Sequence, residues 1–563
     1  MELDYNPSYK TIIKKNKWVS TAASIWIQST SGSAYTFAIY SQVLKTSQGY
    51  NQSTLDTISV FKDFGANVGV LSGLLYSAVT NPRRSSRIGG PWVVLAAGAA
   101  LVFVGYFFMW MSVVGNLPRP PVLLMGLYML LASNATTCFN TANVVTAVHN
   151  FPDYKGTVVG IMKGFLGLSG AILIQVYHTI LNEKPTTFIL MLALLPSITA
   201  LLLMWFVRIT PTNEVGEKKY LNVFSLAAVV LAGYLMAVIV LENVLTFRSA
   251  VRISTFVILI LLLVPPIYIA IKAEKEKARR IIRSLLEQNQ LVYDGNQLGN
   301  NFVQTRQDPE GHQEISCDAD EEMNINNERT VPERGENLNL LQSICTIDFW
   351  LLFFVSACGM GSGLATVNNV SQIGESFGYS TIATSTLTSL WSIWNFIGRL
   401  GSGFVSDYFL HAQGWSRPLF ITITLATMSI GHAVIASGLP GALYAGLVLV
   451  GIGYGSQWSL MPTIVSEIFG PAHMGAIFNT VSIANPVGTY ILSVRVVGYI
   501  YDKEATGSDN TCIGTHCFML SFLIMASTTV LASLVGLILF FRTRNFYRQV
   551  ILRRLYIPIR NLE

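Results

Sequence analysis

Four charged side chains stand inside long apolar stretches of this sequence, at Lys62, Asp63, Lys163 and Arg399. A charge in the hydrocarbon core of a membrane is costly, so such residues usually face a bundle interior, a water-filled path or a partner of opposite sign. The guanidinium of Arg399 offers parallel N–H groups that match the two oxygens of a carboxylate. We therefore expect Arg399 to bind a substrate anion, with Lys163 as a second positive contact.

Asp63 is the candidate for coupling transport to a proton or another cation. It lies about 13 Å inside the outer end of its predicted helix, directly after Lys62. In this hypothesis Asp63 faces the cavity, and Lys62 or Lys163 lies nearby and adjusts the affinity of the Asp63 carboxylate for a proton or cation. Because neighbours on a helix point about 100° apart, Lys62 and Asp63 are not expected to face one partner. The alternative is a structural ion pair between Asp63 and Lys163.

Amide side chains recur in the same apolar stretches and could line a polar cavity. We assign Asn369 and Asn395 to substrate binding. Most of the others are expected only to bridge helices. These others are Asn134, Asn140, Asn143, Asn368, Gln457, Asn479 and Asn485.

Other kinds of chemistry find no support in the sequence. It contains no phosphate-binding glycine loop and no nucleophile motif, and His149 and His432 lack a second ligand at metal-binding spacing. The formal net charge of +6 comes from short Lys and Arg clusters between apolar stretches, which indicates membrane topology and not nucleic-acid binding. We therefore expect no enzyme, no cofactor or metal, and no nucleic-acid partner.

Membrane helices must position these residues. Of the 563 residues 51% are hydrophobic and 12% are charged, against roughly 25% charged residues in an average soluble domain. Apolar stretches of about 20 residues predict an all-α polytopic membrane protein with about fourteen spans. The stretches are 18–42, 55–79, 92–114, 122–148, 156–180 and 188–207, then 221–241 and 253–271, then 349–370, 382–406, 418–436, 442–465, 475–500 and 518–541.

These stretches predict two six-helix bundles with two extra helices between them. The expected domains are a first bundle (1–210), the extra helices (211–271), a linker (272–343), a second bundle (344–542) and a basic tail (543–563). The linker begins as a basic helix and becomes acidic and Asn-rich, which indicates a largely disordered segment. It is either a solvated tether or a binding site for a cytosolic partner. The basic clusters place both termini in the cytosol by the positive-inside rule.

The two bundles repeat one another. Glycines match at equivalent places in the first helices, each followed by a Gly-Tyr pair, and again at the start of the fifth helices. The matched residues are Gly32 with Gly361, Gly49-Tyr50 with Gly378-Tyr379, and Gly156 with Gly475. Duplicated halves are typical of transporters that bind a solute between the halves near the bilayer midplane.

The segment GRLGSGFVSD, from Gly398 to Asp407, and the Arg417-Pro418 pair after it resemble the loop signature of the major facilitator superfamily. The resemblance implies the major facilitator fold, with a cytosolic gate at which Gly403, Asp407 and Arg417 pin neighbouring helices. In the first half Gly73 matches Gly403, but Ser77 stands in the place of Asp407.

Over its whole length the sequence resembles the plant nodulin-like transporters, the group that includes the nuclear-fusion-defective proteins. The resemblance lies in KWVSTAASIWIQSTSGSAYTFAIYSQVLK, SVFKDFGANVGVLSGL and CIGTHCF. It implies a distant likeness to monocarboxylate and oxalate:formate carriers, with an aromatic first helix, here containing Tyr35, and an arginine that holds a carboxylate, here Arg399. Asn395 and Ile39 replace the aspartate and lysine of proton-linked monocarboxylate carriers, so a lactate-like mechanism is not implied.

Cys512 and Cys517 fall together in a polar loop on the predicted non-cytosolic side. An oxidised pair can persist there, so the two thiols either form a disulfide or stay free.

The sequence thus predicts secondary active transport of a small polar solute, an organic anion or carboxylate, in the plasma membrane or an endomembrane of a plant. Two other functions stay open. One is a membrane sensor or scaffold whose linker recruits cytosolic partners. The other is a transporter of cations or amino acids, with Asp63 as the ligand.

Overall fold

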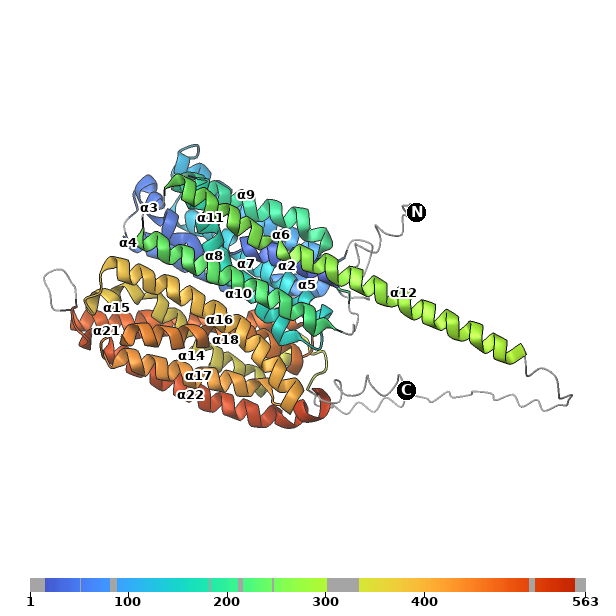
Figure 1. The fold of residues 1–563 in the computed structure, drawn as a ribbon. Helices are drawn as coiled ribbons and strands as arrows, with labels where there is room; N and C mark the ends of the chain where they lie inside the picture. The colour runs from blue at the N-terminus through green and yellow to red at the C-terminus, as the bar shows by residue number, and fades with distance from the viewer. Residues whose placement is uncertain are drawn as a thin grey trace. The chain divides into compact units, whose positions relative to one another are not determined.

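The computed structural model describes residues 16–50, 52–80, 89–181, 184–210, 216–245, 248–300, 334–505 and 512–551. Regular secondary structure within these residues is entirely helical (Figure 1). A membrane interior offers the backbone no hydrogen-bonding partners, and a helix satisfies its N–H and C=O groups within one segment.

Six helical stretches form the N-terminal half, and the first two are interrupted. The first breaks at Gly32, which packs so closely on Ser169 that a Cβ atom there would lie 1.7 Å from the Ser169 hydroxyl. The elements are α2 (Lys17–Thr30), η1 (Ser33–Thr36), α3 (Phe37–Gln48), α4 (Gln52–Asn67), α5 (Val70–Thr80), α6 (Pro91–Val114), α7 (Val122–Asn150), α8 (Lys155–Thr179), α9 (Pro185–Leu203) and η3 (Met204–Phe206).

The extra helices follow, as α10 (Glu217–Val244), α11 (Ser249–Leu263) and α12 (Pro265–Asn300). Pro265 lacks a backbone N–H and begins α12 where α11 ends. The helix α12 continues to Asn300, well beyond position 272 where the sequence places the start of the linker. Residues 271–333 form a unit separate from the rest of the chain.

The C-terminal half repeats the six-stretch pattern. Its elements are α13 (Leu340–Ile344), α14 (Ile347–Asn368), α15 (Val370–Ser376), α16 (Thr381–Gln413), α17 (Arg417–Ala436), α18 (Ala442–Ile468), α19 (Met474–Val481), α20 (Ala484–Thr489), the π-helical η4 (Tyr490–Gly498), α21 (Tyr499–Glu504), α22 (His516–Phe546) and η5 (Tyr547–Ile551).

The segment just before this half already packs on it. The backbone N–H groups of Gly335 and Leu338 donate to the carbonyls of Ile468 and Phe469, at 2.9 Å and 3.0 Å. The side chain of Arg334 pairs with Asp348 of α14 at 2.8 Å. Residues 334–338 therefore already contact the second half, although they lie within the range 272–343 predicted as linker.

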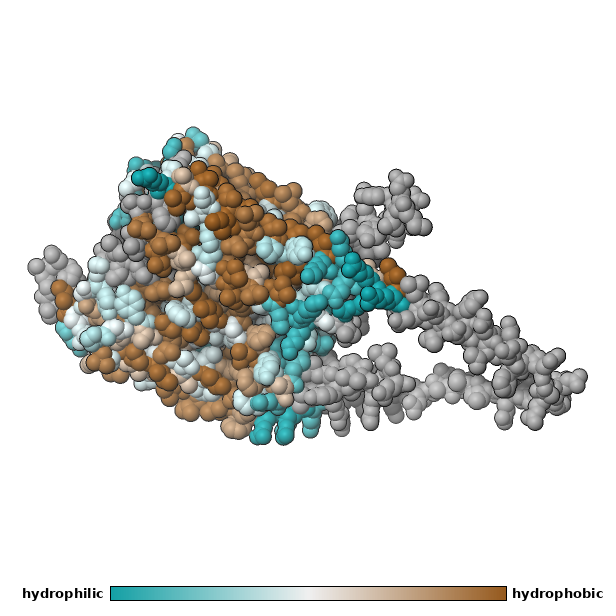
Figure 2. Space-filling model, in the orientation of Figure 1, coloured by the Kyte–Doolittle hydropathy of each residue, from teal (hydrophilic) through white to brown (hydrophobic). Residues whose placement is uncertain are grey.

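The sides of the helices are apolar, as expected for contact with lipid (Figure 2). Exposed large hydrophobic residues include Leu226, Leu261 and Leu531. Eleven helices within the described residues are long and apolar enough to cross a membrane. The predicted spans 18–42, 382–406 and 442–465 are helical but lie outside those eleven, so the total of fourteen spans stays a prediction.

Cys512 and Cys517 are joined in a disulfide at the start of α22. The same loop is bonded to α15, because Ser376 donates to the Cys512 carbonyl and accepts from Gly514 N–H on its own carbonyl, both at 2.8 Å. The loop therefore connects the ends of two helices of the second half.

Candidate functional site

Lys163 and Arg399 come together between the two halves of the molecule. Lys163 lies on α8 of the first half and Arg399 on α16 of the second, with side chains only 1% and 2% exposed. One Nη1 N–H of Arg399 donates to the backbone carbonyl of Lys163 at 2.9 Å. Gly160, Gly164 and Gly167 on α8 allow this approach, since all three pack against Phe396, Arg399 or Leu400 of α16.

The two cations share one aromatic ring. The Lys163 ammonium lies 4.7 Å from the ring centroid of Trp458, and the Arg399 guanidinium carbon lies 5.9 Å from it. Phe478 contributes a second ring at 4.7 Å from the Lys163 ammonium. Aromatic faces attract cations, yet they leave the net positive charge in place.

Neither cation has an anionic partner within the described part of the chain. Arg399 donates through Nε to the side-chain oxygen of Asn395 at 2.9 Å and through Nη1 to the Lys163 carbonyl. Both acceptors are neutral, and among described residues no hydrogen bond engages Nη2. The alternative considered from the sequence, an ion pair between Asp63 and Lys163, does not occur among the described residues, where Asp63 pairs with Lys62 at 3.1 Å.

Tyr35, Asp63 and Arg399 gather around Tyr454 on α18, which lies within electrostatic range of all three. The Asp63 side chain is 37% exposed and that of Lys62 is 16% exposed, with the Lys62 ammonium 5.2 Å from the ring centroid of Phe37. Tyr35 is also exposed, at 53%.

The amide residues differ in what they contact. Asn395 orients Arg399, whereas Asn369 donates to the Ala365 carbonyl at 2.7 Å and to Ser493 at 2.9 Å, and so bridges two helices. Asn479 and Asn485 bridge the two halves of the molecule: Asn479 donates to Thr141 at 2.8 Å and Asn485 to Asn67 at 2.8 Å. Asn134 donates to the carbonyls of Gly65 and Val68.

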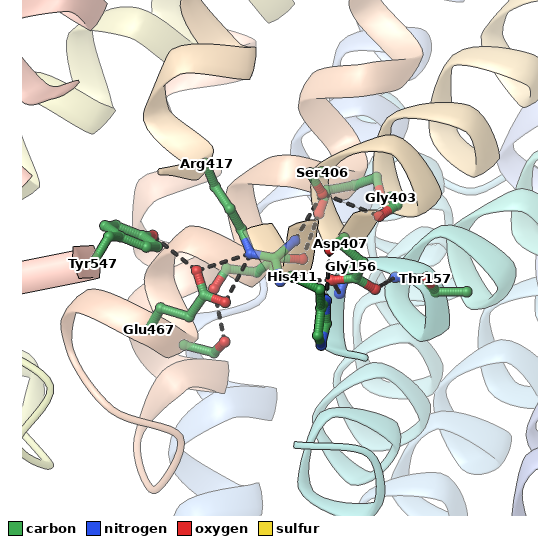
Figure 3. Close-up of polar contacts among 12 residues, drawn as sticks. Gly156, Thr157, Gly403, Ser406, Asp407, His411, Arg417, Glu467 and Tyr547 are labelled. Carbon is green, nitrogen blue, oxygen red and sulfur yellow. Dashed lines mark hydrogen bonds and ion pairs between the residues drawn. The ribbon is translucent and has the colours of Figure 1, made fainter. Parts of the chain in front are cut away.

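A buried polar network surrounds Arg417, at the end of the bundles that we call the Arg417 end (Figure 3). The Arg417 guanidinium contacts Asp407 at 2.6 Å and Glu467 at 2.7 Å, and Nη1 donates to Ser406 at 2.7 Å. Tyr547 donates to Glu467 at 2.8 Å. One guanidinium thus holds two buried carboxylates from α16 and α18.

Asp407 also reaches the first half. Its two carboxylate oxygens accept from the backbone N–H groups of Gly156 and Thr157, at 3.1 Å and 2.5 Å, in the first turn of α8. A helix N-terminus favours a negative charge, because its first N–H groups have no partner within the helix. Gly403 lies against the same turn, where a Cβ atom would come within 2.2 Å of the Gly156 carbonyl oxygen.

A second crossing mirrors this one. Gly73 of α5 packs on the backbone of Gly475 and Ala476 in α19, with an ideal Cβ only 2.4 Å from both. Ser77 donates to the Ala472 carbonyl at 3.4 Å. The residue pairs are those that the internal repeat equates, with a serine hydroxyl and a carbonyl in place of the aspartate and its N–H donors. Within the described residues the contacts of the second crossing therefore involve neutral groups.

Among the described residues one group has the types and spacing of metal ligands, namely Cys512, His516 and Cys517. The disulfide joins two of its three sulfur and nitrogen ligands, so they are not available as thiolates.

The chain matches two family models in sequence. Residues 17–271 match the Nodulin-like domain, and residues 334–549 match the C-terminal domain of NFD4. The chain belongs to the nodulin-like family. Protein NUCLEAR FUSION DEFECTIVE 4 of Arabidopsis thaliana is 25% identical over 97% of this chain and 92% of that protein.

Two further likenesses concern the transporter fold. The probable transporter MCH1 of Yarrowia lipolytica is 28% identical over 31% of this chain and 36% of that protein. The structure of the proton:xylose symporter XylE superposes with a TM-score of 0.51 at 15% identity, over 94% of this chain and 95% of that one. This nodulin-like chain therefore has the major facilitator fold, with many helices that are long and apolar enough to cross a membrane.

Sequence reasoning missed two groups of residues at these sites. Trp458 and Phe478 looked like ordinary apolar residues of their helices, and only the packing of α18 and α19 brings them to Lys163. The backbone N–H groups of Gly156 and Thr157 also carried no signal beyond the repeated glycine. Glu467, near the end of α18, pairs with Arg417 at 2.7 Å.

Proposed function

We propose that this nodulin-like transporter carries a small organic anion by alternating access, with Lys163 and Arg399 as the ligands of its anionic group. The observation that supports this most is two buried cations, one from each half, that share the ring of Trp458 and have no carboxylate partner among the described residues. Two like charges in a site of low dielectric repel one another. An anion between them removes this cost.

The free hydrogen-bonding capacity of Arg399 favours a carboxylate. Asn395 and the Lys163 carbonyl occupy Nε and one Nη1 N–H, which leaves Nη2 for a ligand. A planar guanidinium held by two acceptors is fixed in orientation, so its remaining donors point in one direction. The Lys163 ammonium supplies the second charge, and its location on the other half gives a bound anion contacts to both halves.

The Arg417 network supports a gate at one end of the path. Asp407 and Gly403 of the second half close onto the first turn of α8, and Gly73 closes onto α19. Tyr35 and Asp63 are exposed, in the half of their helices away from this end. In our proposal this is the state closed at the Arg417 end, which the positive-inside rule assigns to the cytosol.

Asp63 is the group that we propose for coupling. Its carboxylate pairs only with Lys62 among the described residues and is reachable from solvent, so a proton or cation can compete with Lys62 for it. Its charge and that of Arg399 both act on Tyr454, which provides a short electrostatic route between coupling ion and substrate.

Ligand-induced stabilisation of the purified protein tests the site. A ligand that binds only the folded state at a concentration of 100 Kd stabilises it by about 2.7 kcal/mol. We expect carboxylates to raise the unfolding temperature of the wild type and of Lys62→Met, but not of Lys163→Met. Stabilisation of Lys163→Met by the same carboxylates would refute the assignment of this lysine.

A further inference from the structure

The extra helix α10 is fixed to the first half of the molecule. Lys17 at the start of α2 forms a buried ion pair with Glu217 at the start of α10. Trp18 packs on Phe151, Tyr220 and Phe224, with ring centroids 5.1 Å, 5.2 Å and 6.3 Å away. The start of α10 therefore moves with the first half.

The same helix also packs against the second half. It lies along both α8 and α16, the two helices that carry Lys163 and Arg399 (Figure 1). At the Arg417 end these three helices enclose a pocket of about 240 Å³. Its lining includes Lys218, Leu221 and Asn222 of α10, with Phe404 and His411 of α16. This pocket is separate from the Lys163 and Arg399 site, and it lies beside the gate because Asp407 and Thr157 also line it.

The mouth of the pocket combines a positive charge with apolar surface. Lys218 is exposed and makes no ion pair with any described residue. Phe404 and Tyr408 line the pocket and are 36% and 51% exposed. A lysine above exposed aromatic side chains at the end of a membrane helix is placed where phosphate groups of lipids lie.

The interior of the pocket offers hydrogen-bond acceptors. His411 Nδ1 lies 2.6 Å from the Asp407 carbonyl oxygen, and the tautomer that donates from Nδ1 leaves Nε2 as an acceptor. This Nε2 is buried and has no hydrogen-bond partner among the described residues. Tyr154 stacks on the His411 ring at 5.1 Å, which fixes the direction of Nε2. The Asp407 carboxylate adds negative charge to the same wall.

From this geometry we propose that the pocket binds the headgroup of a membrane phospholipid that carries an N–H or O–H donor. The lipid phosphate pairs with Lys218, and the headgroup ammonium or hydroxyl donates to His411 Nε2. Ethanolamine and glycerol headgroups meet both requirements. A choline headgroup supplies the phosphate but no donor, and so leaves His411 Nε2 unpaired. The acyl chains then lie along Phe404 and Tyr408.

Such a lipid touches both halves at once. Lys218 belongs to the helix fixed on the first half, whereas His411 follows Asp407 on the second. The bound headgroup therefore favours the arrangement in which the Arg417 end is closed, because separation of α10 from α16 divides its binding site. The lipid acts on the conformational equilibrium only to the extent that it binds the closed state more tightly.

Retention of lipid by the full-length protein tests the proposal without any transport assay. The protein is equilibrated in vesicles with equal amounts of phosphatidylethanolamine and phosphatidylcholine, extracted in mild detergent, and its bound lipids are counted by native mass spectrometry. We expect about a fivefold preference for phosphatidylethanolamine, the preference that one hydrogen bond provides. Phosphatidylglycerol in place of phosphatidylethanolamine should give a similar preference.

Matched variants separate the pocket from general electrostatics. Lys218→Glu should abolish the selective retention, whereas Lys219→Glu, with the same charge change one residue away, should keep it. His411→Phe keeps a ring for Tyr154 but removes the acceptor, so it should retain both lipids equally. Equal retention by the wild type, or equal loss in both lysine variants, would overturn the proposal. Binding of soluble glycerophosphoethanolamine as tight as that of the lipid would also overturn it, in favour of a free phosphate ester.

Discussion

At the scale of single residues, Lys163 and Arg399 carry the chemistry. Each is buried in a membrane helix, each packs on Trp458, and neither is neutralised by a described side chain. A buried ion pair would make both residues structural. Their lack of a partner instead makes the site dependent on an incoming anion, which is why we interpret it as a ligand site.

Arg399→Lys tests the fork geometry, because it keeps the charge and removes the parallel donors. A hydrogen bond to a charged group is worth about 1.5–3 kcal/mol, so we expect carboxylate affinity to fall by about 10- to 100-fold. The measurement is the dissociation constant by titration calorimetry. Arg495→Lys, a helical arginine that lies over Tyr490, is the matched control and should bind like the wild type. Unchanged affinity in Arg399→Lys would contradict the carboxylate hypothesis.

Asp63→Asn separates coupling from binding. The amide keeps the size of the side chain but accepts no proton, so anion affinity should stay within about threefold while flux loses its response to an imposed pH gradient. Flux into vesicles with and without the gradient measures this. Complete loss of anion binding would instead favour Asp63 as a substrate ligand, and an unchanged response to the gradient would remove it from coupling.

At the scale of helices, two glycine crossings connect the halves. Gly403 meets the Gly156 carbonyl, and Gly73 meets Gly475. Among the described residues only the first is accompanied by charge, since Asp407 accepts from the α8 N-terminus and is held by Arg417. We infer that the Asp407 crossing provides most of the energy that closes the Arg417 end, and that the Gly73 crossing acts mainly through close packing.

Gly403→Ala should open this end. The added Cβ would lie 2.2 Å from the Gly156 carbonyl oxygen, and overpacking of this kind costs about 1–3 kcal/mol, a shift of about 5- to 100-fold in the equilibrium. The labelling rate of a Thr157→Cys reporter by maleimide measures opening. Gly401→Ala is the control, because no atom lies within 4 Å of its Cβ position. Equal rates in the two variants would contradict a gate at Gly403.

The loop disulfide should stabilise the second half. Cys512 and Cys517 close a short loop, for which the chain-entropy argument gives about 2 kcal/mol. We expect the Cys512→Ser and Cys517→Ser double variant to unfold at lower temperature in detergent, and a reductant to lower the unfolding temperature of the wild type only. Cys345→Ser removes an exposed free thiol and is the control. A reductant effect that persists in the double variant would exclude this role.

Much of the helical arrangement follows from the sequence, because long apolar stretches and repeated glycines reflect constraints local to one or two helices. Gly73, Gly156, Gly403 and Gly475 were matched by the repeat, and the structure pairs them across the two halves. The separation of Lys163 from Asp63 was not predictable, since it depends on the rotation of α4 and α8 against their neighbours. The contact of Trp458 with both cations has the same cause.

The end of the linker shows a different limit. Arg334 and Gly335 follow an acidic, Asn-rich segment whose composition indicates disorder, and no local pattern distinguishes them from it. Their attachment depends on Asp348 and Ile468, which are distant in sequence. Composition averages over a window and does not detect the residue at which tertiary contacts begin.

At the scale of the whole molecule, the two halves meet at two places. In the middle they meet at Lys163 and Arg399, which have no anionic partner among the described residues, and at the Arg417 end they meet through a closed polar network. In the proposed cycle a bound anion contacts both halves and stabilises an occluded state. The polar network around Arg417 then opens. This order of events requires that the substrate is an anion and that it crosses the membrane.

Counterflow in liposomes measures this claim most directly. The purified protein is reconstituted with carboxylates, amino acids or inorganic ions inside the vesicles, and uptake of the labelled solute is compared between the wild type and Arg399→Ala. We expect counterflow of at least one carboxylate by the wild type, and a loss of about 10- to 100-fold in Arg399→Ala, the range for removal of a charged hydrogen bond. Flux of cationic or neutral solutes alone, or carboxylate flux that survives in Arg399→Ala, would contradict the account.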